Sequence, residues 1–287
     1  MIECCYYKVI LTEDTKPDKN SSFGGSMAHE FDGKKYAKAS AHQKAWGNRL
    51  IAELDFSGNE RVLDLGCGDG ALSLKLAELV PNGKVVGIDA SKGMIETAKE
   101  HEAENLEFLL MDIDKLDFKM KFDLIFSNAT LHWIKDHKKL WNSVTELLYP
   151  NGIVRFNFAA DGNCSNFFFV IEEVMALEKY RAYFSDFEWP WYMPHLSEYE
   201  NILESYPFFD IRIEEENADR YFPDKDAMIG WIDQPSIVPF LKYVPEPERN
   251  AFRETVIERM LGRTSKEDGT CFETFRRINV FARRRKQ

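Results

Sequence analysis

The chain has 287 residues, of which 44% are apolar and 30% are charged, so it can bury a core and is neither disordered nor fibrous. Its length allows about two structural units. The 37 basic and 48 acidic residues give a net charge of −11 at pH 7, and because such a surface repels phosphate backbones we expect no nucleic-acid partner.

The N-terminal part predicts a flexible lead-in followed by a helix. Residues 12–35 are polar and glycine-bearing, and they include Met27, an alternative start. Residues 36–54 carry apolar side chains at three- and four-residue steps, as a helix does. Gln43 shares the apolar face, where an unpartnered polar group is costly, so we expect it to face a ligand. The positions on this face are Gln43, Trp46, Leu50 and Leu54.

From residue 61 onward, short apolar strands alternate with helices. Helices of this length between strands indicate right-handed crossovers and a mainly parallel sheet. Ser91 is expected to cap the second of these helices. The predicted strands are 61–65, 84–88, 106–110, 122–126 and 152–158, and the predicted helices are 72–80, 94–101 and 140–148.

The pattern changes after residue 158. An aromatic stretch, Tyr183 to Tyr192, is irregular, and a mostly helical insertion runs from Phe222 to Thr270. The main helix of the insertion is expected to begin near Pro245 and to end at Gly262. The basic run from Arg283 to Lys286 is expected to be a frayed tail. The other predicted elements are helices at 167–180 and 197–205, strands at 209–215 and 272–282, and a helical stripe of Phe252, Val256 and Met260.

The sequence contains no recognisable membrane anchor or metal site. No stretch approaches the roughly 20 apolar residues of a membrane helix; the most apolar, Asn166 to Ile171, is followed by Glu172. The first residues lack a secretory pattern. The five cysteines include no CxxC pair and no Cys/His cluster with zinc spacing. We therefore expect a reduced, cytoplasmic protein without a bound metal.

The loop from Asp64 to Gly70 lies between the first strand and the first helix. Its alternating glycines let the backbone turn sharply and approach a ligand. With Ala71 it also fits G-x-G-x-x-A, so the glycines suit NAD and S-adenosylmethionine (SAM) equally. Asp64 favours SAM, because it would repel a pyrophosphate and attract an ammonium group. Cys67 is expected to be a small filler residue, since no histidine lies near it in the motif.

Acidic residues also follow the second and third strands. Asp89 is placed to accept hydrogen bonds from ribose hydroxyls, or to cap the following helix. Asp112 or Ile113 would lie at an adenine edge, although a surface acid is equally compatible with Asp112. The expected cofactor-binding residues are Asp64, Gly66, Cys67, Gly68, Asp89, Ala90, Met94, Asp112, Ile113 and Asn128.

The fourth strand runs into the loop that ends Leu131-His132-Trp133, at the edge where open α/β sheets bind ligands. Together, residues 62–134 resemble the class I SAM-dependent methyltransferases. That resemblance implies an α/β fold with a Rossmann-like, mostly parallel seven-stranded sheet flanked by helices. It also implies the strand order 3-2-1-4-5-7-6 with strand 7 antiparallel, and residues 272–282 would form that strand.

Two subgroups are similar to this chain. The segments Tyr221-Phe222-Pro223, Gly230-Trp231-Ile232 and Asp268-Gly269-Thr270 look like the trans-aconitate methyltransferases. Residues 36–43, with Leu131-His132-Trp133, are similar to the insect juvenile hormone acid methyltransferases. Both groups methylate carboxylates. The aromatic stretch from Tyr183 to Tyr192 matches neither.

We therefore expect an enzyme that transfers the SAM methyl group to a carboxylate of a small organic acid and releases S-adenosylhomocysteine (SAH). A carboxylate is ionised at pH 7, so alignment by neutral donors suffices, and Gln43, His132 and Trp133 are the candidates. An amine or hydroxyl acceptor is the first alternative; a hydroxyl would need His132 as a base, with a pKa near 6.5. A SAM-binding regulatory protein without turnover and an NAD oxidoreductase are the others.

The predicted organisation has three parts. Residues 1–50 form a lead-in and cap helix, residues 51–221 with 271–287 form the SAM-binding core, and residues 222–270 form a helical cap insertion. Long insertions in compact domains are usually functional, so we expect this one to close over the cofactor. Trp231, Phe240 and Tyr243 would supply the apolar wall of the acceptor pocket. The expected partner is a small molecule, and the expected state is a monomer or weak homodimer.

Overall fold

The computed structural model describes residues 41–286 of the chain. The predicted lead-in, its alternative start at Met27 and the first turn of the predicted N-terminal helix lie outside the described residues. Helix α2 (Ala41–Ala52) is the described part of that helix, and Leu54 lies beyond its end. Within residues 41–286, no helix is both long and apolar enough to cross a membrane.

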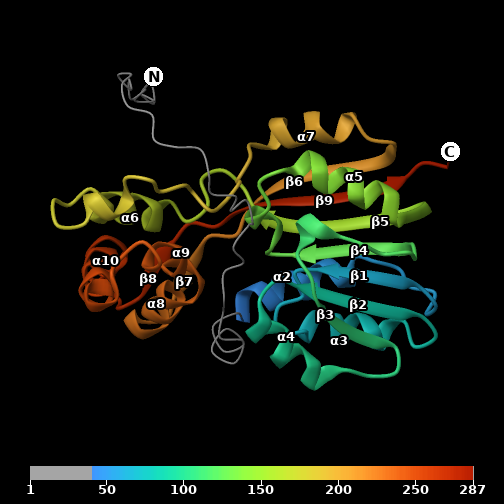
Figure 1. Cartoon of the computed structure of the whole chain (residues 1–287), viewed down its shortest axis with the longest axis horizontal. Coiled ribbons are helices and arrows are strands. Elements are labelled where there is room, and N and C mark those ends of the chain that lie inside the picture. The colour runs from blue at the N-terminus through green and yellow to red at the C-terminus, as the bar shows by residue number, and fades with distance from the viewer. Residues whose placement is uncertain (1–40, 287) are drawn as a thin grey trace, which may run out of the picture.

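A seven-stranded sheet forms the centre of the molecule (Figure 1). Its order, β3-β2-β1-β4-β5-β9-β6, confirms the predicted order, with β9 as the seventh strand of the sheet. Strand β9 pairs antiparallel with both β5 and β6, whereas the β1 to β5 pairs are parallel. The strands are β1 (Arg61–Leu65), β2 (Lys84–Asp89), β3 (Leu106–Leu110), β4 (Phe122–Asn128), β5 (Leu148–Ala159), β6 (Phe208–Asn217) and β9 (Arg276–Arg284).

Helices cover both faces of the sheet because successive strand side chains point to opposite sides. Val62 packs in a cluster with α2, α3 (Ala71–Leu79) and α4 (Lys92–Ala98). Its neighbour Leu63 packs in a second cluster with α5 (His137–Leu147) and α7 (Leu196–Glu204). Ser91 caps α4 as predicted, since its side chain accepts a hydrogen bond from the Met94 N–H.

A second lobe lies at one end of the sheet (Figure 1). Its core contains the predicted stripe of Phe252, Val256 and Met260, which is fully buried. The aromatic stretch after α6 packs on this core through Phe184 and Phe187. The elements of the lobe are α6 (Ser165–Met175), β7 (Arg220–Phe222), α8 (Lys225–Trp231), α9 (Val238–Leu241), α10 (Arg249–Thr264) and β8 (Cys271–Glu273).

Three sequence-based expectations about the C-terminal part are wrong in detail. Residues 272–282 do not form one strand. The first of them belong to β8, which pairs with β7 and ends at Glu273, and the chain joins the main sheet only at Arg276, where β9 begins. Gly262 does not end α10, which continues to Thr264; the glycine is exposed and meets no close neighbour. The basic C-terminal run is not frayed, because Arg284 is buried and donates a hydrogen bond to the Leu148 carbonyl.

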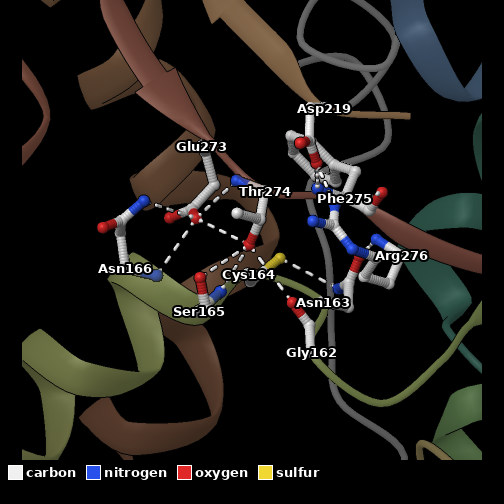
Figure 2. A network of polar contacts seen from close by, with 10 residues as sticks. All are labelled: Gly162, Asn163, Cys164, Ser165, Asn166, Asp219, Glu273, Thr274, Phe275 and Arg276. Atoms are coloured by element: carbon white, nitrogen blue, oxygen red, sulfur yellow. Dashed lines mark hydrogen bonds and ion pairs between the residues drawn. The ribbon is translucent and has the colours of Figure 1, made fainter. Parts of the chain in front are cut away.

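A network of polar contacts joins the β5–α6 loop to the connection between β8 and β9 (Figure 2). The buried Glu273 carboxylate accepts hydrogen bonds from the Asn166 N–H (3.1 Å) and the Phe167 N–H (2.9 Å). These groups belong to the first turn of α6, where helix donors lack backbone partners and negative charge is favourable. Burial raises the pKa of Glu273 above its ordinary value, and these hydrogen bonds oppose the shift.

The rest of the network continues along the same two segments (Figure 2). The Cys164 N–H donates to the Thr274 carbonyl at 2.9 Å, and the Ser165 N–H donates to the Thr274 hydroxyl at 2.9 Å. The Arg276 N–H donates to the Asn163 side chain at 3.2 Å. The start of α6 is therefore held on the strand connection by both backbone and side-chain bonds.

Replacing Glu273 should destabilise the protein, because two or more buried N–H groups lose their acceptor. We expect Glu273→Ala to lower the free energy of unfolding by about 1.5–3 kcal/mol, the range for hydrogen bonds to a charged group. Urea denaturation measures this change. Glu214→Ala, on the exposed part of β6, is the control and should stay within about 0.5 kcal/mol of the parent. Equal losses in the two variants would show that the network adds no stability.

Candidate active site

One cavity of about 450 Å³ lies where the carboxyl ends of the central strands meet the second lobe. Its walls come from the segments after β1, β2, β3, β4 and β5, from α2, and from the insertion. Such edges are where open α/β sheets bind ligands. Every residue that the sequence predicts for the site lines this cavity: Gln43, Asp64, Gly66, Cys67, Gly68, Asp89, Ala90, Met94, Asp112, Ile113, Asn128, His132 and Trp133.

The three glycines of the β1–α3 loop serve different purposes, although all have a positive φ. A Cβ on Gly66 would lie 2.1 Å from the Thr130 side chain, and one on Gly70 would lie 2.7 Å from the Phe108 ring. A Cβ on Gly68 would meet no atom within 4 Å. Gly66 and Gly70 are therefore required by packing, and Gly68 alone leaves room for a ligand.

Asp64 is buried beneath this loop, with 2% of its surface exposed. Its carboxylate accepts a hydrogen bond from the Ser73 hydroxyl at 2.6 Å. Burial, with a smaller contribution from the negative charge of Asp89, raises the pKa of Asp64 to about 7. A cation beside the carboxylate would favour its ionised form and lower this pKa. Asp64 therefore suits the ammonium group of an amino-acid moiety.

Asp89 holds the loop in place from the end of β2. Its carboxylate accepts the Gly68 N–H at 3.1 Å and the Ser91 N–H at 2.9 Å. The Ser91 side chain caps α4, and because Asp89 accepts the Ser91 N–H, it supports the start of that helix as well as the loop. A carboxylate accepts several hydrogen bonds at once, so these contacts are compatible with the predicted role toward ribose hydroxyls.

The segment after β3 contributes a polar and an apolar residue. The Asp112 side chain accepts the Asp114 N–H at 2.9 Å and caps the short 3₁₀ turn from Ile113 to Lys115. Asp112 is half-buried, and Ile113 is buried. Their place in the cavity wall fits an adenine edge, and the capping bond gives Asp112 a structural role as well.

Unpartnered buried polar atoms concentrate at this cavity. Among the described residues, six buried side-chain atoms lack a hydrogen-bond partner, and three of them belong to Gln43 (Oε1), Asn128 (Oδ1) and His132 (Nδ1). The Asn128 amide donates to the Gln43 carbonyl at 2.9 Å, which ties α2 to the end of β4. Ala129 follows with a φ of 58°, a costly conformation for a residue with a Cβ. Buried polar groups normally find partners, so this wall points to a polar ligand.

His132 and Cys67 are both uncharged at neutral pH. Burial lowers the pKa of His132 well below its ordinary value, and the charge of Arg277 lowers it further. If His132 served as a base for a hydroxyl acceptor, its pKa is expected near 6.5. The pKa of His132 instead lies well below that value. Burial raises the pKa of the Cys67 thiol well above its usual range, which agrees with its predicted role as a filler residue.

A buried chain of hydrogen bonds supports the turn that carries His132. The Trp141 indole donates to the Tyr199 hydroxyl at 3.1 Å, and that hydroxyl lies 3.0 Å from His137 Nδ1. His137 Nε2 lies 2.9 Å from the Leu131 carbonyl. Burial lowers the pKa of His137 to about 4, so the neutral ring donates from Nε2 and accepts at Nδ1. These hydrogen bonds therefore fix the position of the turn that carries His132.

The sequence-based prediction missed part of the cavity wall. Trp189 and Trp191, from the aromatic stretch, and Phe168, from α6, line the cavity, and the clustering of aromatic residues was the available signal. Lys135, Lys242 and Arg277 also line it. Trp231 and Tyr243 were predicted correctly as wall residues, but Phe240 is fully buried within the second lobe. It packs behind Trp189 and Trp191 and so supports the wall.

Comparison with known proteins agrees with this geometry. Residues 56–191 match a family described as a methyltransferase domain. Malonyl-[acyl-carrier protein] O-methyltransferase 1 of Ilyobacter polytropus is 36% identical over 129 residues, which cover 43% of this chain and 47% of that protein. The chain therefore spans about half the length of this relative. Trans-aconitate 2-methyltransferase of Escherichia coli is 26% identical over 246 residues, which cover 82% of this chain and 90% of that protein.

Solved structures show the same fold. Phosphoethanolamine N-methyltransferase 2 of Haemonchus contortus, in complex with phosphomonomethylethanolamine and SAH, matches with a TM-score of 0.56. The match covers 89% of this chain and 57% of that chain at 20% identity. The predicted fold is confirmed by this likeness and by the strand order.

Gly68→Val should abolish the binding of SAM and SAH, because the new side chain would enter the open space above the loop. Isothermal titration calorimetry with SAH measures the loss. Gly269→Val is the matched control, since Gly269 also has a positive φ (88°) and open surroundings but lies outside the cavity. Both variants should lose similar stability, and only Gly68→Val should lose binding. Unchanged affinity in a folded Gly68→Val protein would contradict the predicted site.

Proposed function

We propose that this chain, whose residues 56–191 match the methyltransferase domain family, is a SAM-dependent enzyme that methylates a carboxylate of a small organic acid. The observation that carries this proposal is the division of charge in the cavity. Asp64, Asp89 and Asp112 lie at the ends of β1, β2 and β3. Lys44 pairs with Asp69, which follows β1. Lys135, Lys242 and Arg277 come from the remaining segments and outnumber the one carboxylate that lines the cavity there, Glu188. The first group suits the ammonium and hydroxyls of SAM, and the second suits an anionic acceptor.

SAM, when bound, supplies a methyl group on a positively charged sulfur. In this proposal Asp64 binds the ammonium group, and the backbone at Gly68 leaves room for the amino-acid moiety. Asp89 accepts hydrogen bonds from the ribose hydroxyls, and Asp112 with Ile113 lies at the adenine. Ala90 and Met94 provide apolar contacts to the cofactor, and the unpartnered Oδ1 of Asn128 accepts a hydrogen bond from it.

The acceptor carboxylate is ionised at pH 7, so the protein needs no general base. The work of the cavity is alignment of the attacking oxygen and exclusion of water. Gln43 and Trp133 can donate hydrogen bonds without carrying charge, and His132 is neutral. Neutral donors orient an oxygen and leave its lone pairs available for attack.

The names of similar proteins support a carboxylate acceptor without identifying it. The relatives from Ilyobacter polytropus and Escherichia coli are named for malonyl-[acyl-carrier protein] and trans-aconitate, which both carry carboxylates. An amine acceptor, as in the Haemonchus contortus structure, would place a further cation beside Lys135 and Arg277. The charge of the cavity therefore favours an acid over an amine.

The direct test is transfer of labelled methyl from SAM to a panel of organic acids. We expect a methyl ester, recognised because mild base releases the label as methanol. Gln43→Ala should lower kcat by about 10- to 100-fold through lost alignment. Asn48→Ala is the control, because Asn48 lies on the same helix outside the cavity. A base-stable product would indicate an amine or hydroxyl acceptor, and SAH binding without transfer would indicate a regulatory protein.

At saturating SAM, kcat should be nearly independent of pH between about 6 and 9, because the bound ammonium group favours the ionised form of Asp64, whose pKa is raised to about 7 in the free protein. His132 has a lowered pKa, so it protonates only at a pH well below the usual value of 6.5 and stays neutral above it. The carboxylate acceptor is ionised throughout this range. A kcat profile that rises through pH 6.5, and that His132→Asn removes, would instead support a hydroxyl acceptor.

A further inference from the structure

The acceptor side of the cavity is formed by an aromatic wall, which we define as Trp133, Phe168, Trp189 and Trp191. The Trp191 ring lies 5.3 Å from Trp133 and 5.4 Å from Phe168, between centroids. The Phe168 ring lies 5.4 Å from Trp189. All four side chains are half-buried and line the cavity. They form one continuous apolar surface, although they come from three separate parts of the chain.

The aromatic wall is held in place by the protein itself. The Lys135 ammonium donates hydrogen bonds to the carbonyls of Trp189 and Trp191, the latter at 3.1 Å. The Tyr192 N–H donates to the His132 carbonyl at 2.8 Å, which fixes the end of the aromatic stretch to the turn after β4. Phe240 packs behind both tryptophans with centroid distances of 5.9 Å. The surface is therefore preorganised, which suits the binding of an apolar group.

The cations of the cavity already have neighbours within the protein. The Lys44 ammonium pairs with Asp69 at 2.6 Å, and the Lys135 ammonium binds the wall carbonyls. The Arg277 guanidinium donates twice to the Asn157 oxygen, at 3.0 and 2.6 Å, and lies 4.5 Å from the Trp46 ring. The Lys242 ammonium lies 5.0 Å from the ring of Tyr243.

Extra carboxylates on a substrate would be costly in this environment. Each charge that leaves water needs a counter-charge or several hydrogen bonds, and the carbon faces of the aromatic wall offer neither. The Glu188 carboxylate, which directly precedes Trp189 and also lines the cavity, would repel an added carboxylate. A small polycarboxylic acid would bury two or three such charges. A monocarboxylic acid would bury one, at the reacting end, and would place hydrocarbon on the wall.

We infer that the acceptor is a monocarboxylic acid whose apolar body packs on the aromatic wall, in preference to a small polycarboxylic acid such as trans-aconitate. This inference rests on the proposed carboxylate methylation and names the class of acid. It distinguishes the acceptor of this chain from the trans-aconitate for which the Escherichia coli relative is named.

The first test compares kcat/KM for decanoic acid and 4-phenylbutanoic acid with kcat/KM for trans-aconitic acid and tricarballylic acid. Labelled SAM is the donor, and base-labile ester is the readout. We expect at least one apolar acid to exceed both polycarboxylic acids by about tenfold or more, the scale on which apolar pockets discriminate. The two apolar probes distinguish an alkyl from an aromatic body.

A matched pair of variants tests the role of the wall. Phe168 lines the cavity, whereas the next residue, Phe169, is 45% exposed and lies under the Arg263 guanidinium. Phe168→Ala should lower kcat/KM for the preferred apolar acid by about tenfold and leave trans-aconitate unaffected. Phe169→Ala, the same chemical change one residue away, should alter neither. Calorimetry with SAH checks that both variants keep a folded cofactor site.

The outcomes separate this inference from the proposed function. If trans-aconitic or tricarballylic acid is the better substrate, carboxylate methylation stands and the inference is overturned. If Phe168→Ala lowers the rate with every acid equally, the wall is structural and the inference is also overturned. If SAH binds but no acid gives an ester, the proposed function fails, and this inference fails with it.

Discussion

The buried carboxylate of Glu273 is the contact on which the shape of the cavity depends. It caps α6 from the last residue of β8, a strand of the second lobe, just before the chain crosses to the main sheet at Arg276. Phe167 and Phe168 follow directly in that capped turn and line the cavity. A carboxylate can do this because the first turn of a helix offers N–H groups without backbone acceptors. The same contact therefore orients α6 and joins the two halves of the binding site.

Burial then determines the charge of the groups around that cavity. It raises the pKa of Asp64 to about 7 and lowers the pKa of His132, since both effects disfavour the charged form. Asp64 consequently suits a cationic partner, and His132 is a neutral neighbour of the acceptor. The cofactor side and the acceptor side of the cavity thus obtain different chemistry from one physical cause.

Much of this architecture follows from local sequence patterns. The strands from 61 to 128, their helices and the cap at Ser91 depend on hydrophobic periodicity and short motifs, which involve residues close in the chain. The loop from Asp64 to Gly70 and the acid at Asp89 are equally local, so the predicted cofactor side of the cavity could be placed by its position at the strand ends. The roles of its individual residues remain predictions.

By itself, the sequence determined the central strands and helices and the segments that reach the carboxyl edge of the sheet, because strand and helix signals are local. The order of the strands came from the resemblance to class I methyltransferases, since no local signal records which strands pair. Only the tertiary structure decided that Gly66 and Gly70 serve packing while Gly68 faces open space, since Thr130, in the loop after β4, and Phe108, in β3, approach from distant parts of the chain. It also decided that Phe240 supports the wall that Trp189 and Trp191 form. For the same reason, the sequence did not reveal that residues 272–282 are divided between β8 and β9. Each depends on contacts between residues far apart in the chain, which no periodicity or short motif records.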